Sequence, residues 1–246
     1  GIEDRPVQSV LSAVLFKRHA GIGDAAGGEE TAVKLAQGLA LWDDKYIEKL
    51  AALASIIKKG GSRAVLQLGG SGSRLAGIEM APSPVIGSWN MKRPREISRE
   101  EMMHCLRCYA EAGRRLYEAG FEGFSLHGRA GKYIAQFLSP WSNRRTDEFG
   151  GSPENRVRYP LMIVDAIRER TRSDFPVIMG TFSHEGIEGG LSLEEGIEQI
   201  SIMAERGVDA FLLASGGQES LYLECPPYPL PDIPGLDDIT AVKRAL

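Results

Sequence analysis

The segment from Phe121 to Arg156, FEGFSLHGRAGKYIAQFLSPWSNRRTDEFGGSPENR, decides the fold of this chain. It opens with a short apolar run, Gly123 to Leu126, that has the length of a buried strand and leads directly into His127 and Gly128. Barrels of alternating strands and helices place their functional residues where a strand ends in this way. The segment therefore predicts chemistry at the end of a strand.

Three other segments repeat the pattern of an apolar run that ends in small or polar residues. These predicted strands are Ala64–Leu68, Pro176–Thr181 and Asp209–Ala214. Segments with helical periodicity lie between them, and two of these begin with capping boxes, Ser98 with Glu101 and Ser192 with Glu195. Regular alternation of strands and helices predicts a parallel sheet with helices outside it.

The number of strands limits what barrel this chain can form. Residues Val10–Phe16 have the composition of a further strand, and Thr31–Leu35 fits either a short strand or a helical turn. Residues 77–97 contain three prolines and no periodicity, which predicts a long functional loop. Because no glycine fingerprint of an open dinucleotide-binding sheet follows a strand, we expect an α/β fold of the (β/α)8 TIM-barrel type. Four strands are clear and up to six are present, so the barrel is either incomplete or completed by another chain.

Composition narrows the class of protein further. The 246 residues carry a net charge of −4 with basic and acidic residues interspersed, which argues against nucleic acid as a partner. No apolar run reaches the length that would span a membrane. Three cysteines in a chain of this length are typical of a reducing compartment. We therefore expect a cytoplasmic protein with one barrel domain over residues 1–246.

Two motifs have both a functional and a structural interpretation. Cys105 and Cys108 form a C-x-x-C pair, but both fall on one predicted helix without a second pair at zinc spacing, so structural thiols are favoured. Arg144, Arg145, Asp147 and Arg156 are predicted to form an internal network of ion pairs and hydrogen bonds rather than a binding site.

The run IAQFLSPWSNRRTDEFGGSPENRVRY, residues 134–159, resembles the signature of the old yellow enzyme family of NAD(P)H:flavin oxidoreductases. The resemblance extends from LWDD at Leu41 to the SGG that ends at Gly217. It implies an eight-stranded barrel that binds FMN at the carboxyl ends of its strands. It also implies NADH or NADPH as reductant and an activated alkene as the small-molecule substrate.

For the cofactor, the resemblance implies contacts at specific positions of this chain. Gln67 matches the family's flavin-contacting glutamine, and Gly70 stands where the family usually has a histidine. Gly180 stands where the family has an arginine that neutralises negative charge on the flavin. The family's seventh and eighth strands, which hold the FMN phosphate, are expected beyond residue 246.

For the substrate, the resemblance centres on His127, the first of two residues that hold a carbonyl oxygen in the family. The second position is Ala130 here, and the family's proton-donating tyrosine is replaced by Lys132, with Tyr133 beside it. We take His127 and Lys132 as candidate catalytic residues, and His127, Arg129 and Tyr133 as candidate substrate contacts.

Three functional hypotheses follow. The first is an FMN-dependent NAD(P)H oxidoreductase, or ene reductase, with an altered active site. The second is a flavin-free isomerase or cyclase that uses His127 and Lys132 as acid and base. The third is a non-catalytic subunit that forms an oligomer with a related barrel chain, through its helices and the loop at residues 77–97.

Overall fold

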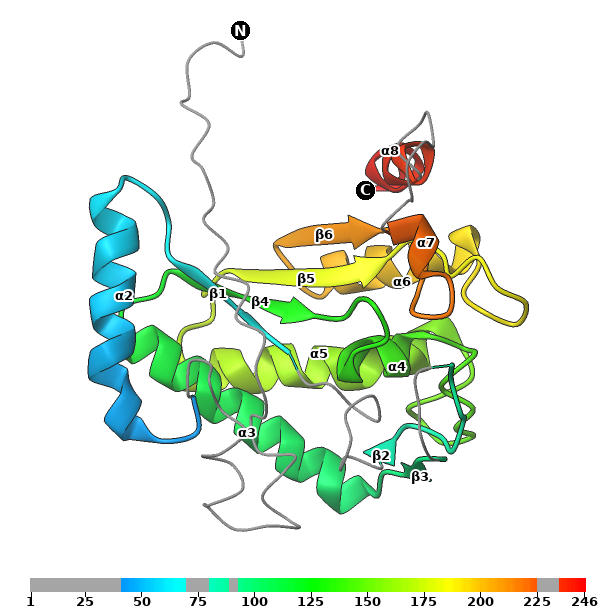
Figure 1. The fold of residues 1–246 in the computed structure, drawn as a ribbon, viewed down its shortest axis with the longest axis horizontal. Coiled ribbons are helices and arrows are strands. Elements are labelled where there is room, and N and C mark those ends of the chain that lie inside the picture. The colour runs from blue at the N-terminus through cyan, green and yellow to red at the C-terminus, as the bar shows by residue number, and fades with distance from the viewer. Residues whose placement is uncertain (1–40, 70–79, 89–92, 225–234) are drawn as a thin grey trace, which may run out of the picture.

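The computed structural model describes residues 41–69, 80–88, 93–224 and 235–246 (Figure 1). Its strands are β1 (Val65–Leu68), β2 (Met80–Ala81), β3 (Arg95–Glu96), β4 (Gly123–His127), β5 (Val177–Phe182) and β6 (Ala210–Ala214). Its helices are the 3-10 turn η1 (Asp44–Tyr46), α2 (Ile47–Lys59), α3 (Arg99–Glu118), α4 (Tyr133–Leu138), α5 (Pro153–Arg170), α6 (Leu193–Glu205), α7 (Leu221–Glu224) and α8 (Leu236–Ala245).

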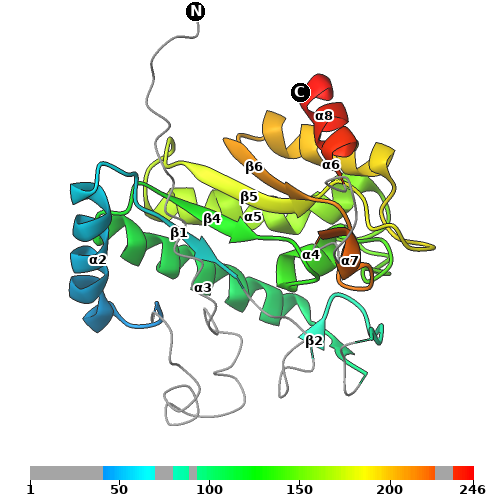
Figure 2. The same cartoon turned by 45° about the horizontal axis from the view of Figure 1, so that its top comes forward.

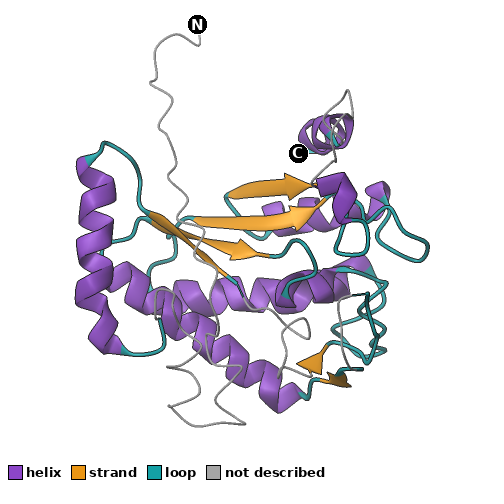
Figure 3. Ribbon diagram, viewed as in Figure 1, coloured by secondary structure: helices purple, strands orange, loops and turns teal. Residues whose placement is uncertain are grey.

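Four strands form one parallel sheet in the order β1, β4, β5, β6. The pairing aligns Leu68 with Leu126, His127 with Gly180, and Gly180 with Leu212. All four strands run toward the same edge of the sheet (Figure 3), so the residues that follow them lie along that edge. The predicted parallel sheet and its four strands are confirmed.

The two faces of the sheet differ in composition. One face carries apolar side chains that are at most 1% exposed: Leu66, Phe124, Leu126, Val177 and Met179. They form one core with residues of α3 and α5, the helices that run along the sheet in Figure 1. The opposite face carries Gln67, Ser125 and His127. The apolar face explains why the helices pack where they do, and it leaves the polar residues for the interior of a barrel.

The helix boundaries follow from their caps. Ser98 and Glu101 form the complete capping box that the sequence predicts for α3. At α6 only half of the prediction holds, because the Ser192 hydroxyl accepts from the Glu195 N–H while the Glu195 carboxylate binds the Arg156 guanidinium at 3.0 Å. Ion pairing with a buried arginine outweighs the second capping bond.

Helix α5 begins at Pro153 and holds Pro160 in its interior. One other expectation needs correction. The loop expected over residues 77–97 contains the short parallel pair β2 and β3. The strand candidates at residues 10–16 and 31–35 lie outside the described part of the chain.

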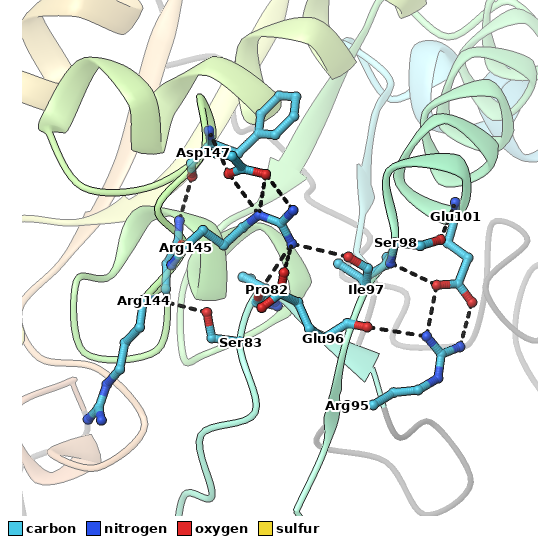
Figure 4. A network of polar contacts seen from close by, with 12 residues as sticks. Pro82, Ser83, Arg95, Glu96, Ile97, Ser98, Glu101, Arg144, Arg145 and Asp147 are labelled. Carbon is cyan, nitrogen blue, oxygen red and sulfur yellow. Dashed lines mark hydrogen bonds and ion pairs between the residues drawn. The ribbon is translucent and has the colours of Figure 1, made fainter.

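An arginine network ties the loop after α4 to the β2–β3 pair (Figure 4). The guanidinium of Arg145, whose side chain is 8% exposed, pairs with Asp147 at 2.6 Å and Glu96 at 3.0 Å. It also donates to the carbonyls of Pro82 and Ile97. Figure 4 shows Arg144 directed away from this cluster, although its N–H donates to Ser83 Oγ. The internal role predicted for Arg145 and Asp147 is confirmed. The prediction for Arg144 is wrong, because its side chain is exposed, whereas Arg156 is buried and pairs with Glu195 at 3.0 Å.

Within the described ranges, no helix is long and apolar enough to cross a membrane, and no group of three or more potential metal ligands is present. Cys105 is buried and Cys108 is partly buried, and both are free thiols on α3. Burial raises the pKa of the Cys105 thiol to about 12, so it stays protonated. The structural interpretation of the C-x-x-C pair agrees with these positions.

We predict that Arg145→Met lowers the free energy of unfolding by about 2–3 kcal/mol, because Asp147 and two carbonyl groups lose a charged donor. Arg145→Lys keeps the charge but not the planar fork, and should give a smaller loss. The measurement is urea unfolding followed by circular dichroism. The control Arg144→Ala, at an exposed site, should change stability by no more than about 0.5 kcal/mol; equal losses for Arg145→Met and this control would contradict the network's role.

Candidate active site at the strand ends

The carboxyl ends of β1, β4 and β5 bring the predicted site residues to one place. Gln67 on β1 lies beside Ser125 on β4, with 3.4 Å between the amide nitrogen and the hydroxyl oxygen. His127 is the last residue of β4 and has Gly180 of β5 as its neighbour in the sheet. Figure 2 shows this edge from another angle, with α4 and α7 beyond the ends of β4 and β6.

Glycines surround His127 because the backbones approach closely there. A Cβ added at Gly69 would lie 3.1 Å from the His127 Cβ. A Cβ added at Gly128 would lie 2.5 Å from the Gly180 carbonyl oxygen, which accepts a hydrogen bond of 2.8 Å from the Gly128 N–H. Glycine is therefore required at 128 to keep β4 and β5 paired past the imidazole.

His127 is neutral at physiological pH. The side chain is 7% exposed, and burial, followed by the positive charges of Arg129 and Lys132, lowers its pKa to about 4. The Arg129 N–H points at Nδ1 from 3.4 Å. Since Nδ1 accepts, the ring proton is on Nε2, and the imidazole can serve as a hydrogen-bond donor from that atom.

The loop from β4 to α4 is a tight reversal. Ala130 and Gly131 have φ values of 45° and 58°, and the Lys132 N–H donates to the Arg129 carbonyl at 3.0 Å. The Gln136 side chain donates to the Gly131 carbonyl at 2.9 Å. Lys132 then caps α4 and is partly exposed, so Arg129 and Lys132 flank His127 from the same loop.

Tyr133, the remaining candidate substrate contact, lies in the core. It is 1% exposed, and its hydroxyl donates to the Tyr159 hydroxyl at 3.0 Å, which in turn donates to the Met102 carbonyl at 2.8 Å. Burial raises the pKa of Tyr133 well above its usual value. The structure thus brings together Gln67, His127, Arg129 and Lys132 but directs Tyr133 away from them; Gly70 lies outside the described residues.

The ends of β5 and β6 add further polar groups. Glu185 is 6% exposed, and its carboxylate accepts from the Ser139 hydroxyl at 2.7 Å and the Leu191 N–H at 2.8 Å. Asp238 on α8 binds both the Ser215 hydroxyl, at 2.8 Å, and His184 Nε2, at 3.0 Å. The buried Ser139–Glu185 contact joins the end of α4 to the loop after β5, which no local pattern in the sequence reveals.

Residues 21–217 match the model of the NADH:flavin oxidoreductase / NADH oxidase family. The chain belongs to this family. It is 36% identical over 180 residues to an NADPH dehydrogenase of Geobacillus sp. (strain WCH70), covering 72% of this chain and 52% of that protein. It is 35% identical over 189 residues to an NADH oxidase of Thermoanaerobacter brockii, covering 74% of this chain and 29% of that protein.

Solved structures of this family share the fold. A complex of 2-naphthoyl-CoA reductase with 2-naphthoyl-CoA has a TM-score of 0.72 and 28% identity, covering 84% of this chain and 34% of that chain. The old yellow enzyme homologue of Zymomonas mobilis, at 22% identity, has a TM-score of 0.62 over 72% of this chain and 55% of that chain. The predicted barrel type is confirmed, and the described strands form part of such a barrel. The chain spans about half the length of the NADPH dehydrogenases it matches.

Two glycines at the strand ends leave the backbone beside His127 without side-chain bulk. Gly69 and Gly180 leave the backbone on either side of His127 without side chains, and a Cβ at either position would fill the space beside His127 or Arg129. Gln67, His127 and Arg129 supply hydrogen-bond donors around this surface. These are the groups that would contact the polar edge of a bound ring.

The low pKa of His127 makes the stability of the chain depend on pH. Between pH 6.5 and about 4 the unfolded chain binds a proton at this residue and the folded chain does not, so stability should fall as pH decreases across that window. The contribution is at most about 3 kcal/mol. Urea unfolding at several pH values should therefore show a shallower pH dependence for His127→Asn than for the original chain. Parallel curves would contradict a buried neutral imidazole, which NMR titration of the ring protons checks independently.

Proposed function

We propose that this chain provides the flavin-ring and substrate contacts of an FMN-dependent NAD(P)H oxidoreductase that reduces activated alkenes. The observation that carries the proposal is the neutral, buried His127 at the end of β4, between two glycines and beside two cationic side chains. Family membership and the names of its relatives, NADPH dehydrogenase and NADH oxidase, support the same class of reaction.

Each residue has a defined task in this proposal. Gln67, fixed beside Ser125, would donate to a polar atom of the FMN ring. His127 would donate its Nε2 proton to the carbonyl oxygen of the substrate, which draws electron density from the conjugated double bond. FMN supplies the hydride chemistry when bound, with NADH or NADPH as its source.

Lys132 is the proton donor in this proposal. Its side chain belongs to the same loop as Arg129, it is partly exposed, and an ammonium group can deliver a proton to the carbon that becomes negatively charged. Tyr133 is not assigned a role, because its hydroxyl is engaged with Tyr159 in the core.

A flavin titration tests the proposal. The purified full chain should take up FMN with a change in its visible spectrum, and NADH or NADPH should bleach the bound flavin in the absence of oxygen. His127→Ala should still take up FMN but reduce a cyclic enone about 10²-fold more slowly, as expected for loss of one donor to a developing negative charge.

His127→Asn is the matched variant, because its amide retains a hydrogen-bond donor, and it should lose less activity than His127→Ala. A protein that takes up no flavin would contradict the proposal. If the chain instead converts a substrate in the absence of flavin, that result would favour an isomerase that uses His127 and Lys132 as acid and base.

A further inference from the structure

The side chain of Arg129 lies next to Gly180 on the neighbouring strand. Gly180 is the neighbour of His127 on β5, so both residues sit at the same level of the strand ends. A Cβ added at Gly180 would lie 3.6 Å from both Cγ and Nε of Arg129, which is ordinary van der Waals contact. The arginine side chain therefore reaches back from the loop after β4 and lies beside β5 at Gly180.

The loop that carries Arg129 turns tightly. Ala130 has a φ of 45°, in the left-handed region that residues with a side chain seldom adopt, and Gly131 follows at 58°. The bond from the Lys132 N–H to the Arg129 carbonyl closes the turn. A strained residue held in place by its surroundings is a feature of functional loops, and this one lies in the turn that follows Arg129.

The position of the guanidinium suits an anion at the strand ends. Arginine keeps its charge at any pH at which the protein is folded, whereas the adjacent His127 is neutral. The positive charge of Arg129 thus lies beside the uncharged donor His127 and next to Gly180, at the strand ends where we propose that the flavin ring binds. A flavin ring that takes up a hydride gains one negative charge, and a fixed cation in a partly buried site stabilises that charge.

We propose that Arg129, held beside Gly180, is the cation that faces the negatively charged reduced flavin. This inference rests on the proposed function. It assigns to Arg129, in the loop after β4, the role that the family resemblance implies for an arginine at position 180. A methyl group at position 180 would make only ordinary contact with Arg129, whereas a full arginine side chain there would compete with Arg129 for one space.

The test compares the dissociation constants of oxidised and reduced FMN for four variants by flavin fluorescence and absorbance under anaerobic conditions. Arg129→Ala should weaken binding of reduced FMN about 10- to 100-fold, as expected for a lost charge-assisted hydrogen bond, with a smaller effect on oxidised FMN. The control Arg144→Ala removes the same charge from an exposed site of the following loop and should leave both constants unchanged.

Moving the arginine from position 129 to position 180 tests whether the two side chains compete for the same space or whether only the positive charge matters. Gly180→Arg alone should be destabilised in thermal unfolding, because two arginine side chains compete for one place. The double variant Arg129→Ala/Gly180→Arg should unfold at a higher temperature than Gly180→Arg alone and regain affinity for reduced FMN relative to Arg129→Ala.

The outcomes are distinct. An original chain that takes up no flavin would overturn the proposed function and this inference together. Flavin uptake with an unchanged ratio of the two constants in Arg129→Ala would overturn only the role of Arg129. A double variant that binds reduced FMN no better than Arg129→Ala would overturn the claim that positions 129 and 180 share one space.

Discussion

The hydrogen bond from the Gly128 N–H to the Gly180 carbonyl, 2.8 Å long, keeps β4 paired to β5 one residue beyond the end of the strand. No side chain fits between these backbones, since a Cβ at Gly128 would lie 2.5 Å from that carbonyl oxygen. The close approach places His127 beside Gly180 and brings the following loop over β5. The place of His127 at the edge of the sheet, and of the loop that follows it, depends on this contact.

The remainder of the structure holds that contact in place. Behind it, Tyr133, Phe137, Phe149 and Tyr159 form a cluster of edge-on and tilted rings that packs α4 against α5. The Ser139–Glu185 bond then links the end of α4 to the loop after β5. Apolar packing and this buried polar contact thus hold the elements around the strand ends together.

Local patterns were sufficient to predict the parts of the fold that depend on local physics. The four strands follow from apolar runs, and the start of α3 follows from the Ser98–Glu101 box. Helix α5 continues through Pro160 where it packs against α3 and α6. The short pair β2–β3 was missed because arginine contacts from a distant loop, not periodicity, fix it.

The candidate site, like the fold, was predicted from the sequence only in part. His127 was predicted from its place at a strand end and Gln67 from the family resemblance, and the structure has them at the end of β4 and within β1. The burial of Tyr133 was not predicted, because its partner Tyr159 is 26 residues away on α5. The loop that carries Arg129 beside Gly180 includes the left-handed φ angle of Ala130, and a sequence does not display that angle.

The most direct test of this account is NMR mapping of flavin binding on the isotopically labelled full chain. We expect the largest shift changes on FMN addition at the side-chain amide of Gln67, the ring of His127 and the backbone N–H of Gly180. These three groups lie on β1, β4 and β5, so their joint response would place the flavin at the shared edge of the sheet. Shift changes confined to α2 or α8, with these three groups unaffected, would contradict the account.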